Sequence, residues 1–417
     1  MIDFGALEEK AEIAENKARG AFSRIAGIAA HNQRKVVTAM RDARVSDAHF
    51  AGSTGYGYGD AGREALDRVY AAVFKSESAL VRHQISTGTQ AIALCMFGNL
   101  RPGDELVSAT GRPYETLLET VGIAGRRGAG SLMDFGVSYA EVGLAADGAI
   151  DYEGLRRAIG SRAKMVFIQR SRGYNWREAF SVDAIAEAVS FVKNIRSDLI
   201  VLVDNCYGEF VEEREPTEVG ADLAAGSLIK NPGGGLAPSG GYIAGAAEYV
   251  KNAAYRLTAP GLGNEVGASL GVNRLLFQGL YFAPHVVAES LKGATFLSAL
   301  MEGEGYRTSP SVDAPRSDII QAVELGSPEL LKAFCLGIQT GSAVDSFLTP
   351  EPWPMPGYSN DIIMAAGTFI QGSSIELSAD APMIEPYIVY AQGGLIYEAA
   401  KIGYLSALEN ICNIQKR

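Results

Sequence analysis

The sequence predicts an α/β protein in which a large, mostly parallel sheet domain is followed by a smaller C-terminal α+β domain. The chain has 417 residues, 47% of them hydrophobic, which is enough to bury a full core and to form more than one domain. Two continuous apolar runs, MVFI at residues 165–168 and LIVLV at residues 199–203, are rich in β-branched side chains, as buried parallel strands are. Such runs alternate with helical stretches over about residues 80–250, which is the pattern of βαβ units.

Three segments precede the predicted sheet. Residues 6–44 are polar and favour helix, with apolar residues such as Ile13, Ile25 and Val36 on one side, so we expect an N-terminal helical extension. HFAGSTGYGYGDAG, at residues 49–62, is rich in Gly and Tyr and predicts a loop or arm. Residues 63–84 return to helical spacing.

Beyond the predicted sheet the pattern is more mixed. We expect helices near residues 288–301 and 328–336, and a proline-rich loop, LTPEPWPMPGY, before further strands. The resulting division has an N-terminal helical arm and interface segment at 1–79, a large α/β domain at 80–275 and a C-terminal α+β domain at 276–417.

Charge and composition exclude several classes of function. With 48 acidic and 37 basic residues, the net charge is −11, and no basic block breaks that balance, so nucleic acid is not an expected partner. No segment resembles a secretory signal or approaches the roughly 18 apolar residues of a membrane span, which leaves the cytoplasm as the expected location. The four cysteines and four histidines are scattered, so we expect neither disulfides nor a metal site.

One glycine motif has the spacing of a dinucleotide-binding fingerprint but not its structural context. Gly57, Gly59 and Gly62 have the spacing G-x-G-x-x-G, but a dinucleotide fingerprint must follow a strand and open a helix. The upstream residues, HFAGST, do not have the pattern of a strand. We therefore interpret this segment as part of the arm.

Polar residues end three of the predicted strands. Asp204 follows LIVLV, Gln169 follows MVFI, and Lys230 follows the small-residue segment that ends in GSLI. Because ligands bind at the carboxyl ends of parallel strands, these side chains are candidates for one shared site.

Their types fit pyridoxal 5'-phosphate (PLP), which needs a lysine for covalent attachment, an acid for its ring nitrogen, a phosphate cradle and usually an aromatic ring against its face. Lys230 precedes the glycine-rich NPGGG and Asp204 could pair with the ring nitrogen. The turn that opens the apolar segment after residue 85 could hold the phosphate through helix N–H groups and hydroxyls. This cradle comprises Ser86, Thr87, Gly88 and Thr89, with Ser227 as a second contact and Tyr114 as the stacking ring.

Several of these segments also carry a family resemblance. STGTQAI, GRPYETL, QRSRGYNWR, the stretch from VDNCYGEF to SGGYIAG, RLTAPGLGNEVGA, MPGY and GTFIQGSSIELSAD together resemble the aluminium-resistance or methionine γ-lyase-like family of PLP enzymes, over about residues 50–400. That family is related to the cystathionine β-lyase and γ-synthase group. The resemblance implies the aminotransferase-type fold (fold type I), PLP on Lys230, Asp204 at the ring nitrogen and Tyr114 stacked on the ring. It also implies a homodimer or homotetramer whose subunits share active sites.

The chain departs from the better-studied cystathionine enzymes at three places. It has Cys206 where they have a threonine two residues after the aspartate, and Ser-Leu-Ile-Lys where they have Ser-x-Thr-Lys. In those enzymes an arm brings a tyrosine and an arginine to the neighbour's phosphate, and the nearest match here is Tyr56, Tyr58 and Arg63 at a different spacing. Cofactor binding is expected to be retained, whereas these departures leave the substrate open.

Each candidate also has an ordinary structural interpretation. A lysine before glycines is often a solvated loop residue, an aspartate after a strand often caps a helix, and a tyrosine after a proline is often packed at the surface. Tyr56 and Tyr58 could be buried at an interface, and Cys206 is more simply a small buried residue near the cofactor than a nucleophile.

Three residues are candidates for substrate binding. Gln169 and Arg172, near a strand end, could contact the cofactor's ring oxygen or the substrate carboxylate, or could serve only structural hydrogen bonds. Arg316 opens the strand-like RSDIIQAVEL and is our first candidate for the carboxylate clamp, because guanidinium binds carboxylate through two parallel hydrogen bonds.

The sequence therefore predicts a carbon-sulfur lyase that acts on an amino acid such as cystathionine, methionine or cysteine. The Lys230 amine, unprotonated because it is partly desolvated, would remove the α-proton, and Tyr114 could protonate the departing thiolate. Elimination at the β- or the γ-carbon remains open. The alternatives are aldol cleavage, transamination or γ-replacement, or a PLP-binding protein with a non-catalytic role in metal tolerance.

Overall fold

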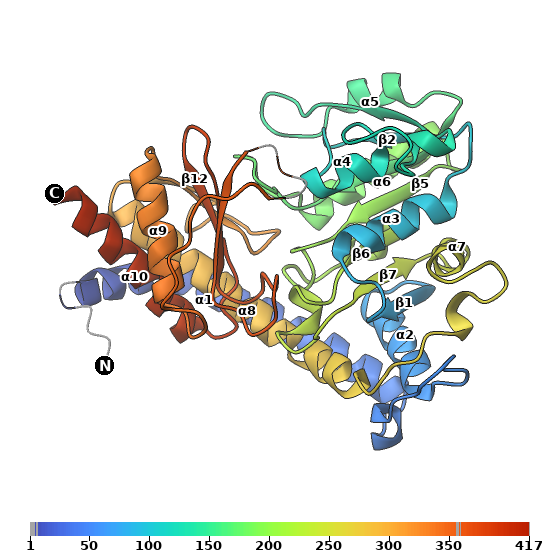
Figure 1. Ribbon diagram of the computed structural model, residues 1–417, viewed down its shortest axis with the longest axis horizontal. Coiled ribbons are helices and arrows are strands. Elements are labelled where there is room, and N and C mark those ends of the chain that lie inside the picture. The colour runs from blue at the N-terminus through green and yellow to red at the C-terminus, as the bar shows by residue number, and fades with distance from the viewer. Residues whose placement is uncertain (1–4, 6, 356–357, 359, 417) are drawn as a thin grey trace.

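Two sheets organise the chain in a computed structural model that describes residues 5, 7–355, 358 and 360–416 (Figure 1). In the described residues, the larger sheet has seven strands in the order β1-β7-β6-β5-β4-β2-β3, and the smaller has five in the order β10-β11-β12-β9-β8. The predicted architecture, a large α/β part followed by a smaller α+β part, is confirmed.

The large sheet is mostly parallel. Its pairings from β3 through β2, β4 and β5 to β6 are parallel, whereas β7 pairs antiparallel with both β6 and β1. The strands are β1 (Ser78–Arg82), β2 (Glu105–Ser108), β3 (Ser138–Glu141), β4 (Ala163–Gln169), β5 (Ile200–Asp204), β6 (Leu223–Ser227) and β7 (Gly241–Gly245). The runs MVFI and LIVLV lie in β4 and β5, as predicted.

Both faces of the central strands are apolar because helices cover both. Met165 and Phe167 pack with one buried cluster, while Val166 and Ile168 pack with another on the opposite face. This alternation with a period of two places every side chain of the run in a core, which explains why the sequence shows a continuous apolar stretch. The helices of this part are α2 (Ala61–Val73), α3 (Gly88–Asn99), α4 (Glu115–Val121), α5 (Tyr152–Ala158), α6 (Val182–Ile195) and α7 (Ala247–Leu257).

The smaller sheet is antiparallel throughout its described pairings and packs in one buried cluster with residues of several helices. Its strands are β8 (Arg307–Ser309), β9 (Gln321–Glu324), β10 (Ile362–Ala366), β11 (Ser378–Pro382) and β12 (Ile388–Gln392), and its helices are α9 (Pro328–Thr340) and α10 (Tyr397–Gln415).

Two long helices, α1 (Leu7–Asp42) and α8 (Asn273–Gly303), lie side by side along both lobes of Figure 1. Ion pairs fix α1 to the end of α8, with 2.7 Å between Lys17 Nζ and a Glu302 oxygen. Further along, Lys35 Nζ lies 2.5 Å from Glu218, next to the large sheet. The predicted N-terminal helix is therefore confirmed. None of the described helices is long and apolar enough to cross a membrane.

One predicted element is wrong. The helical spacing of residues 63–84 continues only to Val73, and Ser78–Arg82 form β1 instead. Lys75 breaks the helix with a φ of 50°, and β1 then pairs with β7, which lies more than 150 residues away. Local spacing cannot show such a distant partner. The predicted helices at 288–301 and 328–336 lie in α8 and α9, whereas residues 356 and 357 of the proline-rich loop lie outside the described residues.

The domain boundaries remain predictions. The one at 79/80 falls inside β1, and the one at 275/276 falls just after α8 begins.

Candidate functional site

The carboxyl ends of β4, β5 and β6 bring three predicted residues to one edge of the sheet. Gln169 is the last residue of β4 and is in register with Asp204, the last residue of β5. Ser227 ends β6, and Lys230 follows three residues later. The strand-end argument therefore identified residues that the fold places together.

The start of α3 lies against the same edge. Thr87 caps the helix by accepting a hydrogen bond from Gln90 N–H at 3.0 Å. A Cβ atom on Gly88 would lie 3.1 Å from Cys206 Sγ and 3.3 Å from Ser227 Cβ, so a larger residue there would have to displace its neighbours by a few tenths of an ångström. The predicted phosphate cradle is thus formed by a helix N-terminus at the ends of β5 and β6.

The hydroxyls of the cradle are not all equally available. Thr89 Oγ1 lies 2.7 Å from Thr116 Oγ1, and Ser86 Oγ donates to the Gln90 side chain at 2.9 Å. Ser86 and Thr87 are exposed, whereas Gly88 and Thr89 are half-buried. The cradle therefore opens outward, where an anion can reach its backbone N–H groups.

Lys230 lies beside an aromatic ring that sequence reasoning missed. Its Nζ is 3.8 Å from the centroid of the Tyr207 ring. Burial by itself lowers the pKa of Lys230, but Tyr207, Cys206 and Asp204 outweigh it, so the pKa lies above its usual value. Desolvation alone therefore does not set the pKa of this amine in the chain without a bound cofactor, and an unprotonated amine in the loaded protein remains a prediction.

Asp204 is a carboxylate whose ionised form a nearby cation would stabilise. It is 9% exposed, and its Oδ1 accepts the Cys206 N–H at 3.1 Å. Burial raises its pKa, while the charge of Lys230 and the Cys206 hydrogen bonds oppose that shift. A protonated ring nitrogen placed against it would stabilise its ionised form.

The turn after Asp204 is held in a strained conformation. Tyr207 and Phe210 have φ values of 71° and 63°, a region that costs each non-glycine residue roughly 1–3 kcal/mol. This backbone turns the Tyr207 ring toward Lys230. The only sequence signal for Tyr207 is its position three residues after the aspartate, and that position does not reveal the positive φ that orients its ring.

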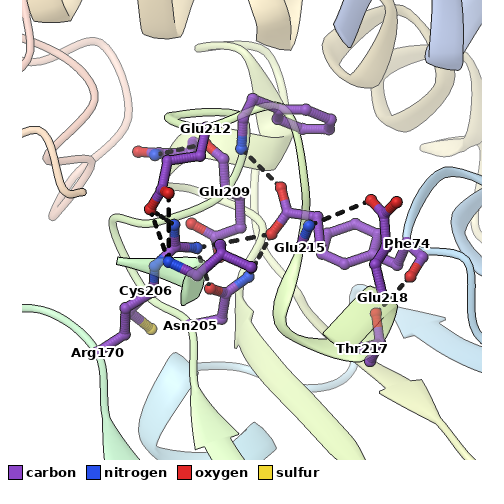
Figure 2. A network of polar contacts seen from close by, with 12 residues as sticks. Phe74, Arg170, Asn205, Cys206, Glu209, Glu212, Glu215, Thr217 and Glu218 are labelled. Carbon is purple, nitrogen blue, oxygen red and sulfur yellow. Dashed lines mark hydrogen bonds and ion pairs between the residues drawn. The ribbon is translucent and has the colours of Figure 1, made fainter. Parts of the chain in front are cut away.

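A buried polar network, drawn in Figure 2, secures this turn. Arg170 donates to Asn205 Oδ1 at 2.7 Å and to Glu212 Oε1 at 2.8 Å. Glu215 accepts from the Phe210 N–H at 2.9 Å and from Asn205 Nδ2 at 3.0 Å. The network therefore offsets the strain and fixes the residues on either side of Tyr207.

Tyrosines from both parts of the chain gather near the lysine. Tyr114, at the N-terminus of α4, shares a 2.7 Å hydrogen bond with the Tyr358 hydroxyl and contacts the edge of Tyr174 at a centroid separation of 5.9 Å. Tyr174 donates to Asp380 Oδ2 at 3.1 Å. Tyr114 therefore lies in the candidate site, and its stacking on a cofactor remains a prediction. Asp380 and Tyr174 were not identified from the sequence.

Gln169 and Arg172 are buried at 6% and 0% exposure. Gln169 donates to Ser171 O at 3.3 Å, while its Oε1 has no hydrogen bond to a described residue. Arg172 donates to Ser309 O at 2.8 Å and thereby joins the two parts of the chain, but its Nε and Nη2 lack hydrogen-bond partners among the described residues. Arg172 therefore retains donors, and the substrate roles of both residues remain predictions.

Arg316 does not open a strand, because β9 begins only at Gln321. Its guanidinium donates to Gln321 Oε1 at 2.6 Å and to Thr295 Oγ1 at 3.1 Å. Burial, with the nearby charge of Arg172, lowers its pKa to about 10. These contacts stabilise the small domain, and a carboxylate clamp at Arg316 remains a prediction with only Nη1 unpaired among described residues.

The arm residues separate into two groups. Arg63 is 3% exposed and donates to Gly57 O at 2.8 Å and to Gly267 O at 3.0 Å, so it holds the arm within this chain, and its contact with a neighbour's phosphate remains a prediction. Tyr56 and Tyr58 are 75% and 63% exposed and are free to contact another molecule. The segment follows a short 3-10 helix rather than a strand, which agrees with setting the dinucleotide motif aside.

The residues present fit PLP. A half-buried lysine amine, a buried carboxylate without a nearby ion pair among the described residues, and a glycine-opened helix N-terminus supply the donors and acceptors that its aldehyde, ring nitrogen and phosphate require. Lys230 would carry the cofactor, Asp204 would meet the ring nitrogen, and the N-terminus of α3 with Ser227 would hold the phosphate.

Solved structures of distant relatives define the class of fold. The PLP-dependent protein YhfS from Escherichia coli matches with a TM-score of 0.61 at 17% identity, over 92% of this chain and 96% of that one. The methionine γ-lyase CalE6 from Micromonospora echinospora matches with a TM-score of 0.55 at 18% identity, over 84% of this chain and 86% of that one. The aminotransferase-type α/β fold expected from the sequence is thereby confirmed.

The chain belongs to the methionine gamma-lyase family, whose model matches residues 7–412. It is 51% identical to the uncharacterized protein YnbB of Bacillus subtilis (strain 168), over 98% of this chain and 96% of that protein. A Listeria monocytogenes structure, named as a candidate cystathionine β-lyase involved in aluminium resistance, is 50% identical with a TM-score of 0.95, over 97% of this chain and all of that one. A Clostridium novyi carbon-sulfur lyase involved in aluminium resistance is 50% identical with a TM-score of 0.94, over 97% of this chain and 96% of that one.

Proposed function

We propose that the protein is a PLP-dependent carbon-sulfur lyase acting on a sulfur-containing L-amino acid. The observation that carries this proposal is the meeting of Lys230, Asp204 and the glycine-opened start of α3 at the carboxyl ends of β5 and β6. The names of the Listeria and Clostridium relatives support the reaction type.

The bound cofactor would supply an electron sink for the pair of electrons left on the substrate's α-carbon when its proton is removed. Asp204 maintains that capacity by holding a proton on the ring nitrogen. This pairing also engages one of the groups that raise the pKa of Lys230, so the pKa of the freed amine falls and more of it is unprotonated and able to accept a proton.

The chain's own groups then move protons. Lys230 Nζ takes the α-proton, the carbon-sulfur bond breaks with its electrons on sulfur, and a tyrosine hydroxyl near the lysine returns a proton to the departing thiolate. Tyr114 is the candidate donor, since the pKa of its hydroxyl is raised by burial and it stays protonated. Loss from the γ-carbon requires a further proton transfer at the β-carbon, for which Lys230 is again the candidate.

A homodimer or homotetramer is part of this proposal. Tyr56 and Tyr58 are exposed on the arm and would complete the phosphate site of a neighbouring subunit. Apolar side chains exposed near the start of α8, such as Leu270 at 63% and Tyr281 at 47%, give that neighbour a surface to cover.

Release of keto acid, thiol and ammonia tests the activity. The purified protein loaded with PLP is assayed with cystathionine, methionine, cysteine and neutral thioethers of cysteine and homocysteine. Pyruvate indicates β-elimination and 2-oxobutyrate indicates γ-elimination. If no sulfur amino acid yields a keto acid, the lyase proposal fails, and bound cofactor without turnover of any amino acid favours a non-catalytic role.

A further inference from the structure

Asp380 is a second carboxylate at the candidate site that cofactor binding does not require. It lies on β11 of the small domain, and its Oδ2 accepts hydrogen bonds from the Tyr174 hydroxyl and from Gln392 Nε2, both at 3.1 Å. Its Oδ1 has no hydrogen bond to a described residue, and the residue is half-buried. One oxygen is therefore anchored, while the other is available.

Packing brings Asp380 toward the lysine, because Tyr174, which donates to Asp380, and Tyr207, whose ring contacts Lys230, pack against one cluster of buried side chains. Burial raises its pKa, while Gln392, Tyr174 and the charge of Lys230 oppose that shift. Asp380 in turn raises the pKa of the Tyr207 hydroxyl, whose ring contacts Lys230. The carboxylate and the lysine are therefore linked through the packed rings of Tyr174 and Tyr207.

Three tyrosine rings surround Tyr174, the hydrogen-bond donor to Asp380. Tyr174 lies 5.3 Å from Tyr390, 5.9 Å from Tyr358 and 5.9 Å from Tyr114, measured between centroids. Tyr174, Tyr358 and Tyr114 are half-buried, so their surfaces are not wholly enclosed. Ring faces beside a carboxylate attract a cation from two directions.

Once a cofactor is attached to Lys230, no positively charged side chain of the described residues pairs with Asp380. No Lys, Arg or His nitrogen among them lies within 4 Å of it, the limit for the ion pairs described above. Covalent attachment of a cofactor would tie the Lys230 nitrogen to the cofactor rather than leave it to pair with Asp380, and a desolvated carboxylate is costly without a partner. A neutral side chain such as that of methionine or cysteine would leave this cost uncompensated.

We propose that Asp380, with the Tyr174 and Tyr358 rings, selects substrates whose leaving thiol carries an ammonium group. This inference rests on the proposed lyase function and specifies its substrate class as cationic thioether amino acids. Asp380 is then a specificity residue that touches the departing half of the substrate.

Matched thioethers test the proposal. S-(2-aminoethyl)-L-cysteine and S-propyl-L-cysteine differ only by ammonium in place of methyl, and S-carboxymethyl-L-cysteine carries the opposite charge. The corresponding homocysteine thioethers cover γ-elimination. We expect kcat/KM of the holoenzyme to favour the cationic member over the neutral one by about tenfold to a hundredfold, because a charge-assisted hydrogen bond to Asp380 is added.

Asp380→Asn should lower this ratio to about one, while Asp313→Asn, an exposed control in the same domain, should keep it. Equal use of both thioethers by the unmodified enzyme overturns the assignment of Asp380 and leaves the lyase function standing. No keto acid from any thioether or other sulfur amino acid overturns the lyase function itself.

Equilibrium binding gives a readout independent of turnover. The quaternary amine (2-methylthioethyl)trimethylammonium cannot form a Schiff base, so calorimetric titration of the holoprotein reports only the cation site. We expect binding to the unmodified protein and to Asp313→Asn, and at least about tenfold weaker binding to Asp380→Asn. Equal affinity for all three proteins contradicts the proposal.

Discussion

Asp204 combines burial, a raised pKa and a position beside Lys230, and each property suits a carboxylate that awaits a cation. Asp204→Asn keeps the shape of the side chain but removes the charge. We expect the variant to fold, because the ladder between β5 and its neighbours is unchanged, and to lose at least about a hundredfold in turnover. Circular dichroism and keto-acid release from the same preparation check this, and near-normal turnover would refute the role of Asp204.

Glu209 gives a separate test through the pH dependence of stability. Burial raises its pKa from 4.5 to about 8, with Glu215 adding to the shift, and its Oε1 accepts the Tyr242 hydroxyl hydrogen bond at 2.9 Å. Because the folded pKa is raised, the stabilisation is fully present below about pH 4.5 and is lost as pH rises toward about 8.

Glu209→Gln removes this proton equilibrium. We expect the unmodified protein to lose a few kcal/mol more unfolding free energy than the variant between pH 5.5 and 8.5, at about 1.4 kcal/mol per pKa unit. Urea unfolding at the two pH values measures the difference. Parallel losses in both proteins would mean that Glu209 is already ionised in the folded state.

At the residue scale, the sequence predicts the site residues that stand at the ends of apolar strands. Asp204, Gln169 and Lys230 terminate or follow apolar runs, so their common location was visible. Tyr207 depends on a positive φ, and Asp380 reaches the site only because β11 of a second sheet packs near the first. Arg63 is only the nearest match to the arm arginine, at a different spacing, and its carbonyl partners at residues 265 and 267 are distant in sequence.

At the scale of elements, the approach of α3 to β5 and β6 depends on Gly88. In Gly88→Ala the new Cβ would meet Cys206 Sγ at 3.1 Å and Ser227 Cβ at 3.3 Å, so the start of the helix must shift by a few tenths of an ångström. We expect PLP affinity to fall about tenfold, as is typical of overpacking by one methyl group. Gly160→Ala is the control, since nothing lies within 4 Å of its Cβ position.

Titration of the cofactor-free variants with PLP, followed by absorbance, measures both affinities. Unchanged affinity in Gly88→Ala would show that the cradle does not require this close approach.

The elements themselves were predictable where both faces of a strand are buried. β4 and β5 appear as continuous apolar runs because each alternate side chain enters a core. The sequence pattern predicts helix at β1, because Ser78–Arg82 are a short segment whose strand form depends on pairing with β7. A local pattern cannot distinguish such a segment from the end of α2.

At the scale of the whole molecule, α1 links the small domain to the turn that carries Tyr207. Lys17 pairs with Glu302 at one end, while at the other Asn32 Nδ2 donates to Phe210 O at 3.1 Å and to Glu212 O at 2.9 Å. The helix was predictable from its composition. Its connecting role was not, because these partners lie about 180 to 285 residues away in sequence.

The central claim is that Lys230 carries PLP, and absorbance tests it most directly. The protein purified with PLP should show the band of a lysine-bound cofactor near about 420 nm, a property of the cofactor's own chemistry, and borohydride should reduce it irreversibly. Lys230→Ala should lack any borohydride-reducible band while its circular dichroism remains unchanged. A folded Lys230→Ala protein that retains such a band would contradict the account.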